Sequence, residues 1–305
     1  MYVIESLKLY KQSLDENRGF FFEKYKNMKI AIQGVNGAFH EIAAKEYFGD
    51  DITTLNCNQF KDLFSAVEHG TADYGICAIE NTIAGSILEN YLLLKRSKLK
   101  IIGEISLHIT QNFMVLPGTK IEDIHEVYSH PIAIQQSKDF LDNYPDMKII
   151  NWSDTASSAQ KIKEEKLTNA AAIASEYAAD LYGLEILARN IQTHKKNYTR
   201  FLALSRIPVD SEENNKASIC FELSHQPGSL VDVLAAFKQH EINLTKIQSL
   251  PILGSPYQYT FYVDLEWKDK NKFDAALAAV LKVVSNLSVL GEYKRDEKFN
   301  YEILN

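Results

Sequence analysis

This 305-residue chain has few cysteines, no excess of basic residues and no long hydrophobic run. Its three cysteines, Cys57, Cys77 and Cys220, share no metal-ligand spacing, and each lies in or beside an apolar segment. We therefore expect buried free thiols rather than a disulfide or a zinc site. The formal net charge of −7 and the pI near 5.7 argue against a general nucleic-acid binder, because a surface that follows phosphates needs a basic excess.

Signals for membranes, metals and nucleotides are also missing. No segment approaches the roughly 18 apolar residues of a membrane span, and charges interrupt residues 1–27 too often for a signal peptide. None of the eight histidines forms an H-x-x-x-H pair, and the chain contains no G-x-S-x-G, G-K-[ST] or G-x-G-x-x-G motif. These absences predict a cytoplasmic protein that contacts no membrane or nucleic acid and needs no metal or cofactor.

The hydrophobic pattern from Lys29 onward predicts an α/β fold with two lobes. The apolar runs KIAIQG, ITTL and YGICAI alternate with helix-period stretches, which is typical of a mostly parallel sheet covered by helices. A second series starts at NFMVL and predicts strands at EVYS, KII and AAIA, helices over 132–143 and 155–165, and a helix closed by Gly183. If the run FLALSR at 201–206 returns to the first lobe, a cleft separates the lobes, as in periplasmic binding proteins.

A linker and a small C-terminal module follow. Residues 207–215 are polar and acidic without apolar periodicity. Residues 216–295 predict the order βαββαβ, a ferredoxin-like arrangement in which Ser229 caps the first helix. A domain this small with one open sheet face often pairs with a copy of itself. The expected boundaries are an extension (1–27), a two-lobed domain (28–206), the linker (207–215), the module (216–295) and a tail (296–305).

Polar side chains gather where predicted strands end, and ligand sites in open α/β sheets lie at the carboxyl ends of strands. The loop QGVNGAFHEIAA places Gly34 and Gly37 where backbone N–H groups could approach an anion, although an ordinary βα turn has the same appearance. The loop AIENTIAGSILENY is either a surface turn or a functional loop, and its polar residues are Glu80, Asn81, Thr82 and Ser86.

Two further loops have a capping interpretation beside the functional one. Ser129 and His130 precede Pro131, which suits the first turn of a helix, so Ser129 could be an N-cap. Thr155 and Ser157 begin another helix, and capping explains at least one of them. Finally, KKNYTRF at 195–201 places the hydrogen-bonding side chains of Asn197, Thr199 and Arg200 at the start of an apparently buried strand.

In order along the chain, these segments resemble the prephenate dehydratase family followed by an ACT regulatory domain, over about residues 29–295. Gly34 to His40 resembles the family's G-P-x-G-[TS]-[FY]-S segment, AIENTIAGS its P-I-E-N-S…G-S segment, and SHPIAIQQ its S-H-P-Q-A-L-x-Q segment. The stretch from Thr155 to Ala159 resembles a T-A-x-A-A helix start, and the block ending in KKNYTRF carries the T-R-F signature, the most specific of the set. The positions that depart from the family's residues are Val35, Ala38, His40, Thr82 and Ile132.

The resemblance implies a carbon–oxygen lyase without cofactor that converts prephenate to phenylpyruvate in L-phenylalanine biosynthesis. Thr199 and Glu80 would be catalytic: Thr199 donates to the departing hydroxyl, and the proton comes from water or from Glu80. Arg200 would fork onto one substrate carboxylate, and backbone N–H groups around 36–39 would bind the other. The implied substrate-binding residues are Asn36, Gly37, Ala38, Phe39, Asn81, Thr82, Ser86, Ser129, Gln136, Thr155, Asn197, Arg200 and Phe201.

The ACT resemblance implies allosteric inhibition by L-phenylalanine in a homodimer or homotetramer assembled through ACT and catalytic domains. PGSL at 227–230 matches the family's G-A-L turn, and Gln248 and Leu250 replace a charge pair of its E-S-R-P segment. The implied effector-binding residues are Gly228, Ser229, Leu230, Asn243, Leu244, Gln248 and Ser249. Three alternatives remain: arogenate dehydratase, a non-catalytic two-lobed binding protein, and a transcriptional sensor, although no export signal or helix-turn-helix is present. About 27 residues ahead of the first strand are too few for a fused chorismate mutase domain.

Overall fold

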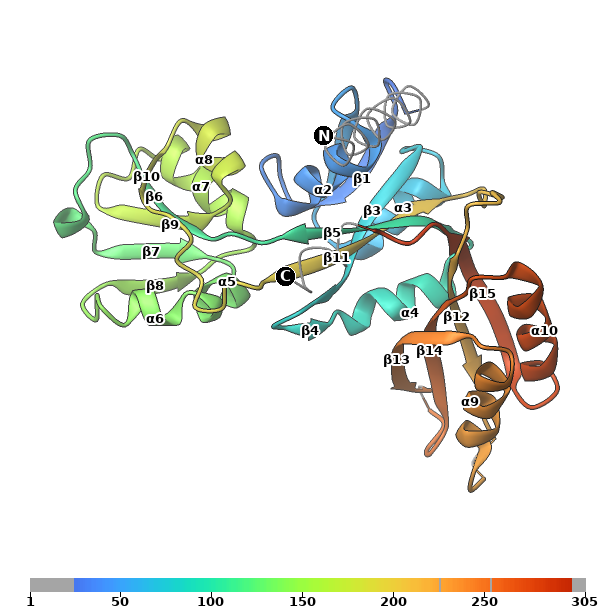
Figure 1. Cartoon of the computed structure of the whole chain (residues 1–305). Coiled ribbons are helices and arrows are strands. Elements are labelled where there is room, and N and C mark those ends of the chain that lie inside the picture. Colours follow the sequence, from blue (N-terminus) through green and yellow to red (C-terminus); the bar gives the residue numbers. More distant parts are fainter. Residues whose placement is uncertain (1–24, 225, 253, 298–305) are drawn as a thin grey trace, which may run out of the picture. The chain divides into compact units, whose positions relative to one another are not determined.

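The computed structural model describes residues 25–224, 226–252 and 254–297 (Figure 1). Most of the expected N-terminal extension and of the expected C-terminal tail lies outside these residues. The chain packs into two compact units. The first contains the described residues up to Leu63, Gly70–Ile76 and Ile109–Lys195; the second contains Phe64–His69, Cys77–His108 and the described residues from Lys196 on.

A parallel pair of strands opens the first unit. β1 (Lys29–Gln33) pairs with β2 (Thr53–Cys57) and with the first residues of β3 (Tyr74–Asn81). α2 (Phe39–Phe48) follows β1, and α3 (Phe60–Glu68) follows β2. Ahead of β1, the Tyr25 side chain is 2% exposed, and its ring lies 5.0 Å from that of Phe48. Tyr25, assigned from sequence to the extension, is therefore part of the core.

A second sheet in the first unit has the strand order β10-β6-β9-β7-β8. β7 is parallel to β8 and β9, whereas β6 is antiparallel to β9 and β10. Five completely buried residues form β9, which explains its continuous apolar sequence. The bounds are β6 (Asn112–Val115), η1 (Ile121–Asp123), β7 (Glu126–Ser129), β8 (Lys148–Asn151), α7 (Thr155–Glu164), β9 (Ala170–Ala174), α8 (Glu176–Tyr182) and β10 (Glu185–Ala188).

The predicted strands and helices of this sheet are confirmed, with two corrections. The sequence prediction did not include β10. The helix expected over 132–143 is two short helices, α5 (Pro131–Gln136) and α6 (Lys138–Leu141). Ser137 separates them because its φ of −104° and ψ of 18° leave the helical region while the apolar pattern continues.

The helix caps of this unit agree only in part with those that the sequence suggested. His130, not Ser129, is the N-cap of α5, and its Nδ1 accepts from the N–H of Ile132 at 3.2 Å. Asp154 caps α7 in a capping box with Ser157, so the capping role expected at this helix start is confirmed for Ser157. Gly183 ends α8 in the left-handed conformation, as predicted.

The second unit begins with the end of β3, which lies next to β11 (Tyr198–Ser205) in the strand order β2-β1-β3-β11-β5. The return of FLALSR to the first sheet is thus confirmed. β4 (Gly85–Ser86) and α4 (Leu88–Arg96) follow β3. β5 (Lys100–His108), antiparallel to β11, was missed because Gly103 and Glu104 interrupt its apolar run.

The C-terminal module has the predicted order βαββαβ, in an antiparallel sheet of strand order β13-β14-β12-β15. Its elements are β12 (Lys216–Glu222), α9 (Ser229–Gln239), β13 (Asn243–Pro251), β14 (Tyr259–Glu266), α10 (Lys270–Val280) and β15 (Ser285–Tyr293). A core that includes Phe221, Phe237 and Phe273 joins the sheet to both helices. Ser229 does not cap α9, since Gly228 is the N-cap with φ of 88° and Ser229 Oγ donates to Ser224 O.

The other face of the module's sheet is largely covered, contrary to expectation. Ser218 and Cys220, which point away from the helices, are buried. A Cβ on Gly291 of β15 would lie 2.1 Å from the carbonyl oxygen of Ile101, so β5 passes directly against this strand. The Tyr262 ring also packs 5.2 Å from the Tyr91 ring of α4. The sheet therefore docks on the strand and helix that precede it in the same unit.

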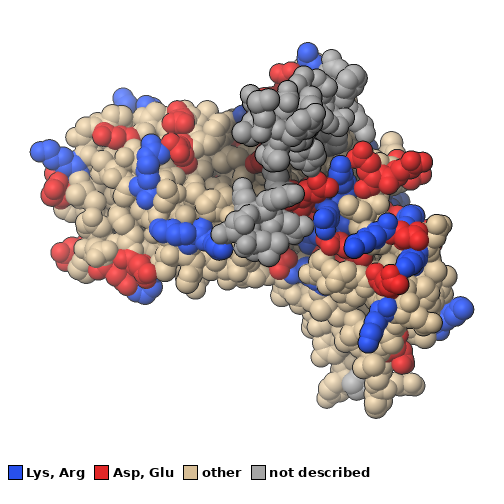
Figure 2. Space-filling model, in the orientation of Figure 1, with Lys and Arg blue, Asp and Glu red and all other residues tan. Residues whose placement is uncertain are grey.

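Several bulk predictions can be compared with the structure. All three cysteines are free and buried, as expected. Acidic and basic side chains are interspersed on the face shown in Figure 2. Within residues 25–224, 226–252 and 254–297, a helix with the length and hydropathy of a membrane span is not found. Nor do these residues bring three or more histidine, cysteine or acidic side chains together as metal ligands would be. The linker over 207–215 contains no helix or strand.

Candidate functional site

A tight hairpin in the second unit carries the I-E-N segment. β3 and β4 pair antiparallel, with Glu80 opposite Ser86 and Asn81 opposite Gly85. Asn81 Oδ1 accepts hydrogen bonds from the N–H groups of Ile83 and Ala84, at 2.9 and 2.8 Å. An asparagine that bonds its own backbone in this way fixes the turn, so the hairpin is rigid at Asn81.

Asn81 also joins the hairpin to β11. Its Nδ2 lies 2.7 Å from Asn197 Oδ1 and 3.0 Å from Thr199 Oγ1. Because Asn81 Oδ1 accepts from two backbone N–H groups, the orientation of the amide is set and its NH₂ group faces Thr199. Thr199 Oγ1 therefore accepts this bond, and its own hydrogen is directed elsewhere. Because Thr199 Oγ1 accepts a hydrogen bond from Asn81, its hydroxyl hydrogen can be donated to another group.

Backbone contacts lock the same two segments together. The N–H of Thr82 donates to the carbonyl oxygen of Tyr198 at 2.9 Å, and the N–H of Tyr198 donates to Thr82 Oγ1 at 3.0 Å. Thr82 Oγ1 also donates to the carbonyl oxygen of Lys196 at 3.2 Å. Thr82, which was expected to bind substrate, thus makes structural contacts that position the T-R-F segment.

The N-Y-T-R-F sequence divides between the two faces of β11, since successive side chains of a strand alternate. Asn197 and Thr199 face Asn81, and Asn197 and Phe201 are buried. Arg200 points to the opposite face, where its partners come from β5 and from the C-terminal module. This alternation explains how three hydrogen-bonding residues can border an apolar strand.

Arg200 is the centre of a buried ionic cluster. Its Nε donates to Glu104 Oε2 at 2.6 Å, its Nη1 to Asp264, and its Nη2 to the Tyr293 hydroxyl at 3.0 Å. Lys216 Nζ lies 2.9 Å from Glu104 Oε1. We call Arg200, Glu104, Lys216, Asp264 and Tyr293 the Arg200 cluster. Arg200, which the family resemblance assigned to a substrate carboxylate, is thus bonded to two carboxylates of the protein itself.

Electrostatics keep the cluster ionised despite its burial. Burial raises the pKa of Glu104, but Arg200 and Lys216 outweigh it and hold that pKa below its ordinary value. The pKa of Asp264 is likewise lowered, because Arg200 and Lys216 overcome the effect of desolvation. The carboxylates in turn keep the pKa of Arg200 above its usual value against the opposing effect of burial. Removing the Arg200 guanidinium would leave Asp264 as a buried carboxylate without its ion-pair partner, whereas Glu104 would keep Lys216.

Glu80 faces the C-terminal module. Its Oε1 lies 2.7 Å from Lys246 Nζ, which also donates to Ser86 Oγ at 2.9 Å. A cavity of about 410 Å³ that is lined by polar and charged residues borders this face. Its lining includes Glu80, Thr82, Tyr198, Arg200, Asn243 and Thr245. Glu80 therefore lies on the Arg200 side of the strands, while Thr199 is bonded on the Asn81 side. Within the described part of the chain, no hydrogen bond joins Glu80 to Thr199.

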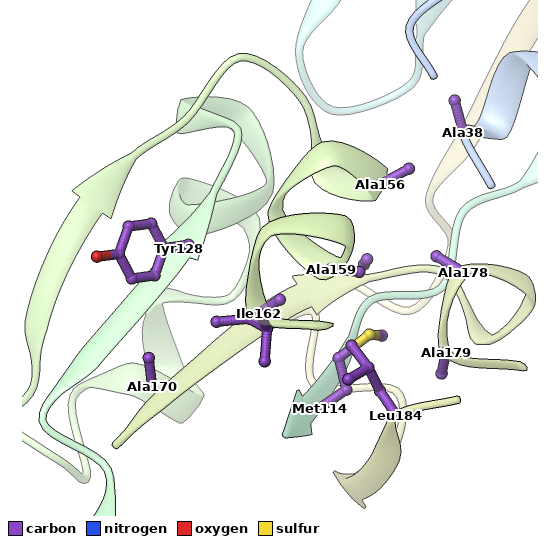
Figure 3. Close-up of a cluster of buried hydrophobic side chains, with 12 residues drawn as sticks. Ala38, Met114, Tyr128, Ala156, Ala159, Ile162, Ala170, Ala178, Ala179 and Leu184 are labelled. Atoms are coloured by element: carbon purple, nitrogen blue, oxygen red, sulfur yellow. The ribbon is translucent and has the colours of Figure 1, made fainter. Parts of the chain in front are cut away.

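The glycine loop ahead of α2 belongs to the first unit, where it packs on α8. Gly37 has φ of +91°, and a Cβ there would lie 3.3 Å from Ala178, so this position requires glycine. Ser175 Oγ donates to the carbonyl oxygen of Gly37, and the Tyr182 hydroxyl donates to that of Asn36 at 2.6 Å. Figure 3 shows Ala38 at the edge of the cluster that contains Ala156 and Ala178.

Two N–H groups of this loop are already engaged. The N–H of Gly37 donates to Glu41 Oε2 at 2.7 Å, and the N–H of Ala38 donates to the carbonyl oxygen of Val35 at 3.1 Å. Of the amides expected to bind a substrate carboxylate, these two therefore have internal acceptors. Asn36 Oδ1 accepts from Asn56 Nδ2 at 2.8 Å, so its side chain serves the loop as well.

The remaining expected residues of the first unit are structural or partly buried. Ser129 is fully buried and its Oγ donates to the carbonyl oxygen of Ile173 at 2.7 Å. Gln136 is 7% exposed, and its carbonyl oxygen accepts from the N–H of Thr193. Thr155 is the first residue of α7, and Phe39 that of α2. His40 replaces a family serine and is neutral, because burial lowers its pKa to about 3.

Expected effector residues lie at two places in the module. Gly228, Ser229 and Leu230 begin α9. Asn243, Leu244, Gln248 and Ser249 lie on β13, an edge strand of the sheet. Leu244 packs against the hydrophobic core, and Gln248 Nε2 donates to the carbonyl oxygen of Ser249.

Sequence reasoning missed four charged residues and one tyrosine that surround the T-R-F strand. These are Glu104, Lys216, Lys246, Asp264 and Tyr293. A signal did exist: Glu104 and Asp264 stand inside otherwise apolar strands, and a buried carboxylate implies a partner. The identity of those partners could not be read from spacing, since they come from strands far apart in the sequence.

Fold and site together define a mixed α/β chain with a polar hairpin held against a buried strand. A family model described as prephenate dehydratase matches residues 30–208. The bifunctional chorismate mutase/prephenate dehydratase of Aquifex aeolicus (strain VF5) is 37% identical over 272 residues, covering 88% of this chain and 74% of that protein. Arogenate dehydratase/prephenate dehydratase 2, chloroplastic, of Arabidopsis thaliana is 38% identical over 283 residues, covering 88% and 73%. The chain belongs to the prephenate dehydratase family.

Solved structures agree with this assignment. Prephenate dehydratase from Arthrobacter aurescens in complex with L-Phe aligns with a TM-score of 0.80 and 27% identity, covering 88% of this chain and 91% of that one. A structure named GqqA, a novel type of quorum quenching acylase, aligns with a TM-score of 0.81 and 28% identity, covering 89% and 99%. The second match shows that a protein of another reported activity shares this fold.

Proposed function

We propose that this protein is a prephenate dehydratase that converts prephenate to phenylpyruvate, CO₂ and water. Membership of the family supports the reaction, and the contact between Asn81 and Thr199 carries the mechanism. Prephenate is a dianion whose ring carboxylate leaves as CO₂ while the ring hydroxyl leaves as water. The electron pair of the broken carbon–carbon bond enters the ring, and the carbon–oxygen bond breaks. One proton is taken up by the departing hydroxide.

Thr199 donates a hydrogen bond to the oxygen on which charge develops. An aliphatic hydroxyl is a weak acid, so Thr199 stabilises the leaving oxygen rather than supplying its proton outright. Asn81 orients the hydroxyl, since its amide occupies an acceptor position of Thr199 Oγ1 at 3.0 Å. Glu80 remains part of the proposed site, with its carboxylate held by Lys246 on the other side of the strand. In this proposal the proton comes from water, because the Glu80 carboxylate is paired with Lys246 and lies across the strand from Thr199.

Substitutions at Thr199 test this role. Thr199→Val keeps the size and β-branching but removes the hydroxyl, and we expect kcat to fall by roughly 10²–10⁴. Thr199→Ser keeps the hydroxyl as a matched control and should retain most of the turnover. Steady-state assays with prephenate, following phenylpyruvate, measure both variants. Near-wild-type kcat in Thr199→Val would remove the hydroxyl from the mechanism.

The C-terminal module is proposed to be an ACT domain that binds L-phenylalanine as an inhibitor in a homo-oligomer. Its βαββαβ order and edge strand β13 support this, as does the Arthrobacter aurescens structure solved in complex with L-Phe. Exposed apolar side chains on and beside the edge strand, Ile247 and Tyr259, offer a surface for a second copy. Calorimetry that detects no binding and assays that show no inhibition at millimolar phenylalanine would exclude this regulation.

Arogenate is the second candidate substrate, because the Arabidopsis thaliana relative carries both dehydratase names. One experiment decides between the two: purified protein is mixed with prephenate or with arogenate while phenylpyruvate and phenylalanine are followed. A larger kcat/KM for prephenate supports the proposal, whereas a larger value for arogenate replaces it. Turnover of neither substrate, together with acylase activity, would favour the chemistry reported for the quorum-quenching structure.

A further inference from the structure

One residue of the C-terminal module reaches the catalytic hairpin directly. Lys246 lies on β13, the strand that carries four of the expected effector-binding residues. Its Nζ lies 2.7 Å from Glu80 Oε1 and 2.9 Å from Ser86 Oγ, which stand opposite each other in the β3–β4 pairing. A single ammonium thus bonds both strands of the hairpin at the same rung.

An irregularity in β13 aims Lys246 at this target. In the pairing with β14, Leu244 lies opposite Leu265 and Lys246 opposite Asp264, so Thr245 is an extra residue. Leu244 and Leu265 face the core beneath the helices, whereas Asp264 faces Arg200. Without the extra residue, residues 244 and 246 would share a face. A bulge of this kind re-aims a side chain, and here it turns Lys246 away from the core and toward the hairpin.

The contact is partly desolvated. The Lys246 side chain is 11% exposed, and its Nζ lies 5.8 Å from the centre of the Tyr91 ring. The Glu80 side chain, which supplies the carboxylate of this ion pair, is 35% exposed. A charge-assisted bond that excludes water on one side is stronger than a surface ion pair, and it restrains both long side chains.

The hairpin that Lys246 holds is the one that orients Thr199. Glu80 and Asn81 are adjacent in β3. A restraint on the Glu80–Ser86 pair therefore also restrains the neighbouring Asn81–Gly85 pair, from which the Asn81 side chain reaches β11. Asn81 then contacts Thr199 Oγ1 at 3.0 Å. We propose that Lys246 is a positioning residue of the dehydratase site, through which the C-terminal module sets the geometry of the Glu80–Ser86 hairpin. This inference rests on the proposed function, because it assigns Thr199 the catalytic hydroxyl.

β13 then carries both the expected effector-binding residues and the lysine that holds the catalytic hairpin. An effector that shifts β13 moves Lys246, and the hairpin loses or gains its restraint. Loss of Lys246 therefore weakens the coupling between phenylalanine and turnover without removing the phenylalanine site. If Lys246 only tethered the module to the hairpin, its loss would leave the response of turnover to phenylalanine unchanged.

Lys246→Met and Lys246→Arg test the positioning role, with Lys95→Met as matched control. Lys95 of α4 also joins the module by an ion pair, to Glu222 at 2.5 Å, but does not contact the hairpin residues named above. We expect Lys246→Met to lower kcat for prephenate roughly ten-fold or more with KM within about two-fold, since hydrogen bonds to charged groups are of that strength. Lys246→Arg should recover most of kcat, and Lys95→Met should leave it unchanged.

Hydrogen exchange provides a readout independent of turnover. Amide protection of residues 82–84 should fall roughly ten-fold in Lys246→Met but not in Lys95→Met. Equal exchange and equal kcat in the two methionine variants would overturn the proposal. If the wild-type protein does not convert prephenate, the proposed function fails, and hydrogen exchange alone then decides whether Lys246 holds the hairpin.

Discussion

Replacing Arg200 tests whether this side chain belongs to a structural cluster or to a substrate site. In the structure the guanidinium has three partners, Glu104, Asp264 and the Tyr293 hydroxyl. The Arg200 side chain is 14% exposed, and those of Asp264 and Glu104 are 9% and 4% exposed. Arg200→Met would leave Asp264 with Ser218 as its neutral partner, while Glu104 keeps Lys216.

The expected cost follows from this burial. Removing one partner of a buried ion pair costs about 3–5 kcal/mol, because the other charge stays desolvated. Asp264→Asn should cost a similar amount, since it leaves Arg200 with one carboxylate. If the two residues act on each other, the double variant Arg200→Met/Asp264→Asn should be more stable than the sum of the single changes, by about 0.5–3 kcal/mol. A matched control is Arg206→Met, since Arg206 Nη1 donates to the carbonyl oxygen of Val67.

Urea unfolding of the four variants measures these free energies, and prephenate kinetics measure the consequence for the site. We expect KM to change little in Arg200→Met under conditions where the protein stays folded, because its guanidinium faces away from Thr199. The opposite pattern would refute this reasoning: an unfolding free energy within about 0.5 kcal/mol of wild type, together with a KM raised by orders of magnitude. Arg200 would then bind substrate, as the family resemblance implied.

Two further predictions concern the first unit. Burial lowers the pKa of His40 to about 3, whereas an unfolded histidine titrates near 6.5, so the unfolded chain takes up a proton between these values that the folded chain does not. The contribution of neutral His40 to the free energy of unfolding should be fully present above pH 6.5 and should fall by about 1.4 kcal/mol per pH unit below it. In chemical unfolding, His40→Gln should flatten this dependence between pH 6.5 and 5. An unchanged slope would contradict the assignment. Gly37→Ala should destabilise the protein by more than Gly118→Ala, since both positions have positive φ but a Cβ at Gly37 meets Ala178 at 3.3 Å and one at Gly118 meets nothing within 4 Å. Strain at positive φ is of the order of 1–3 kcal/mol, so equal losses in thermal unfolding would show that the packing against α8 is irrelevant.

The resemblance to a dehydratase and most of the helices and strands were accessible from sequence, because both depend on local patterns. Apolar runs and helix periodicity give element types, and the T-R-F, I-E-N and S-H-P segments are contiguous in the chain. Gly183 at a helix end and Pro131 at a helix start act through their own backbone conformations, so their positions could be predicted as well. The βαββαβ module follows from the same periodicities.

Which side chains meet could not be predicted, because that depends on the face of each strand and on partners distant in sequence. Arg200 and Thr199 are adjacent in the chain yet point to opposite faces of β11. One extra residue at Thr245 reverses the side of β13 on which Lys246 emerges. Sequence determined the residue types for binding an anion and donating a hydrogen bond; the pairing of strands and their register alone decided that the arginine is held by buried carboxylates and that a lysine of the C-terminal module holds the hairpin.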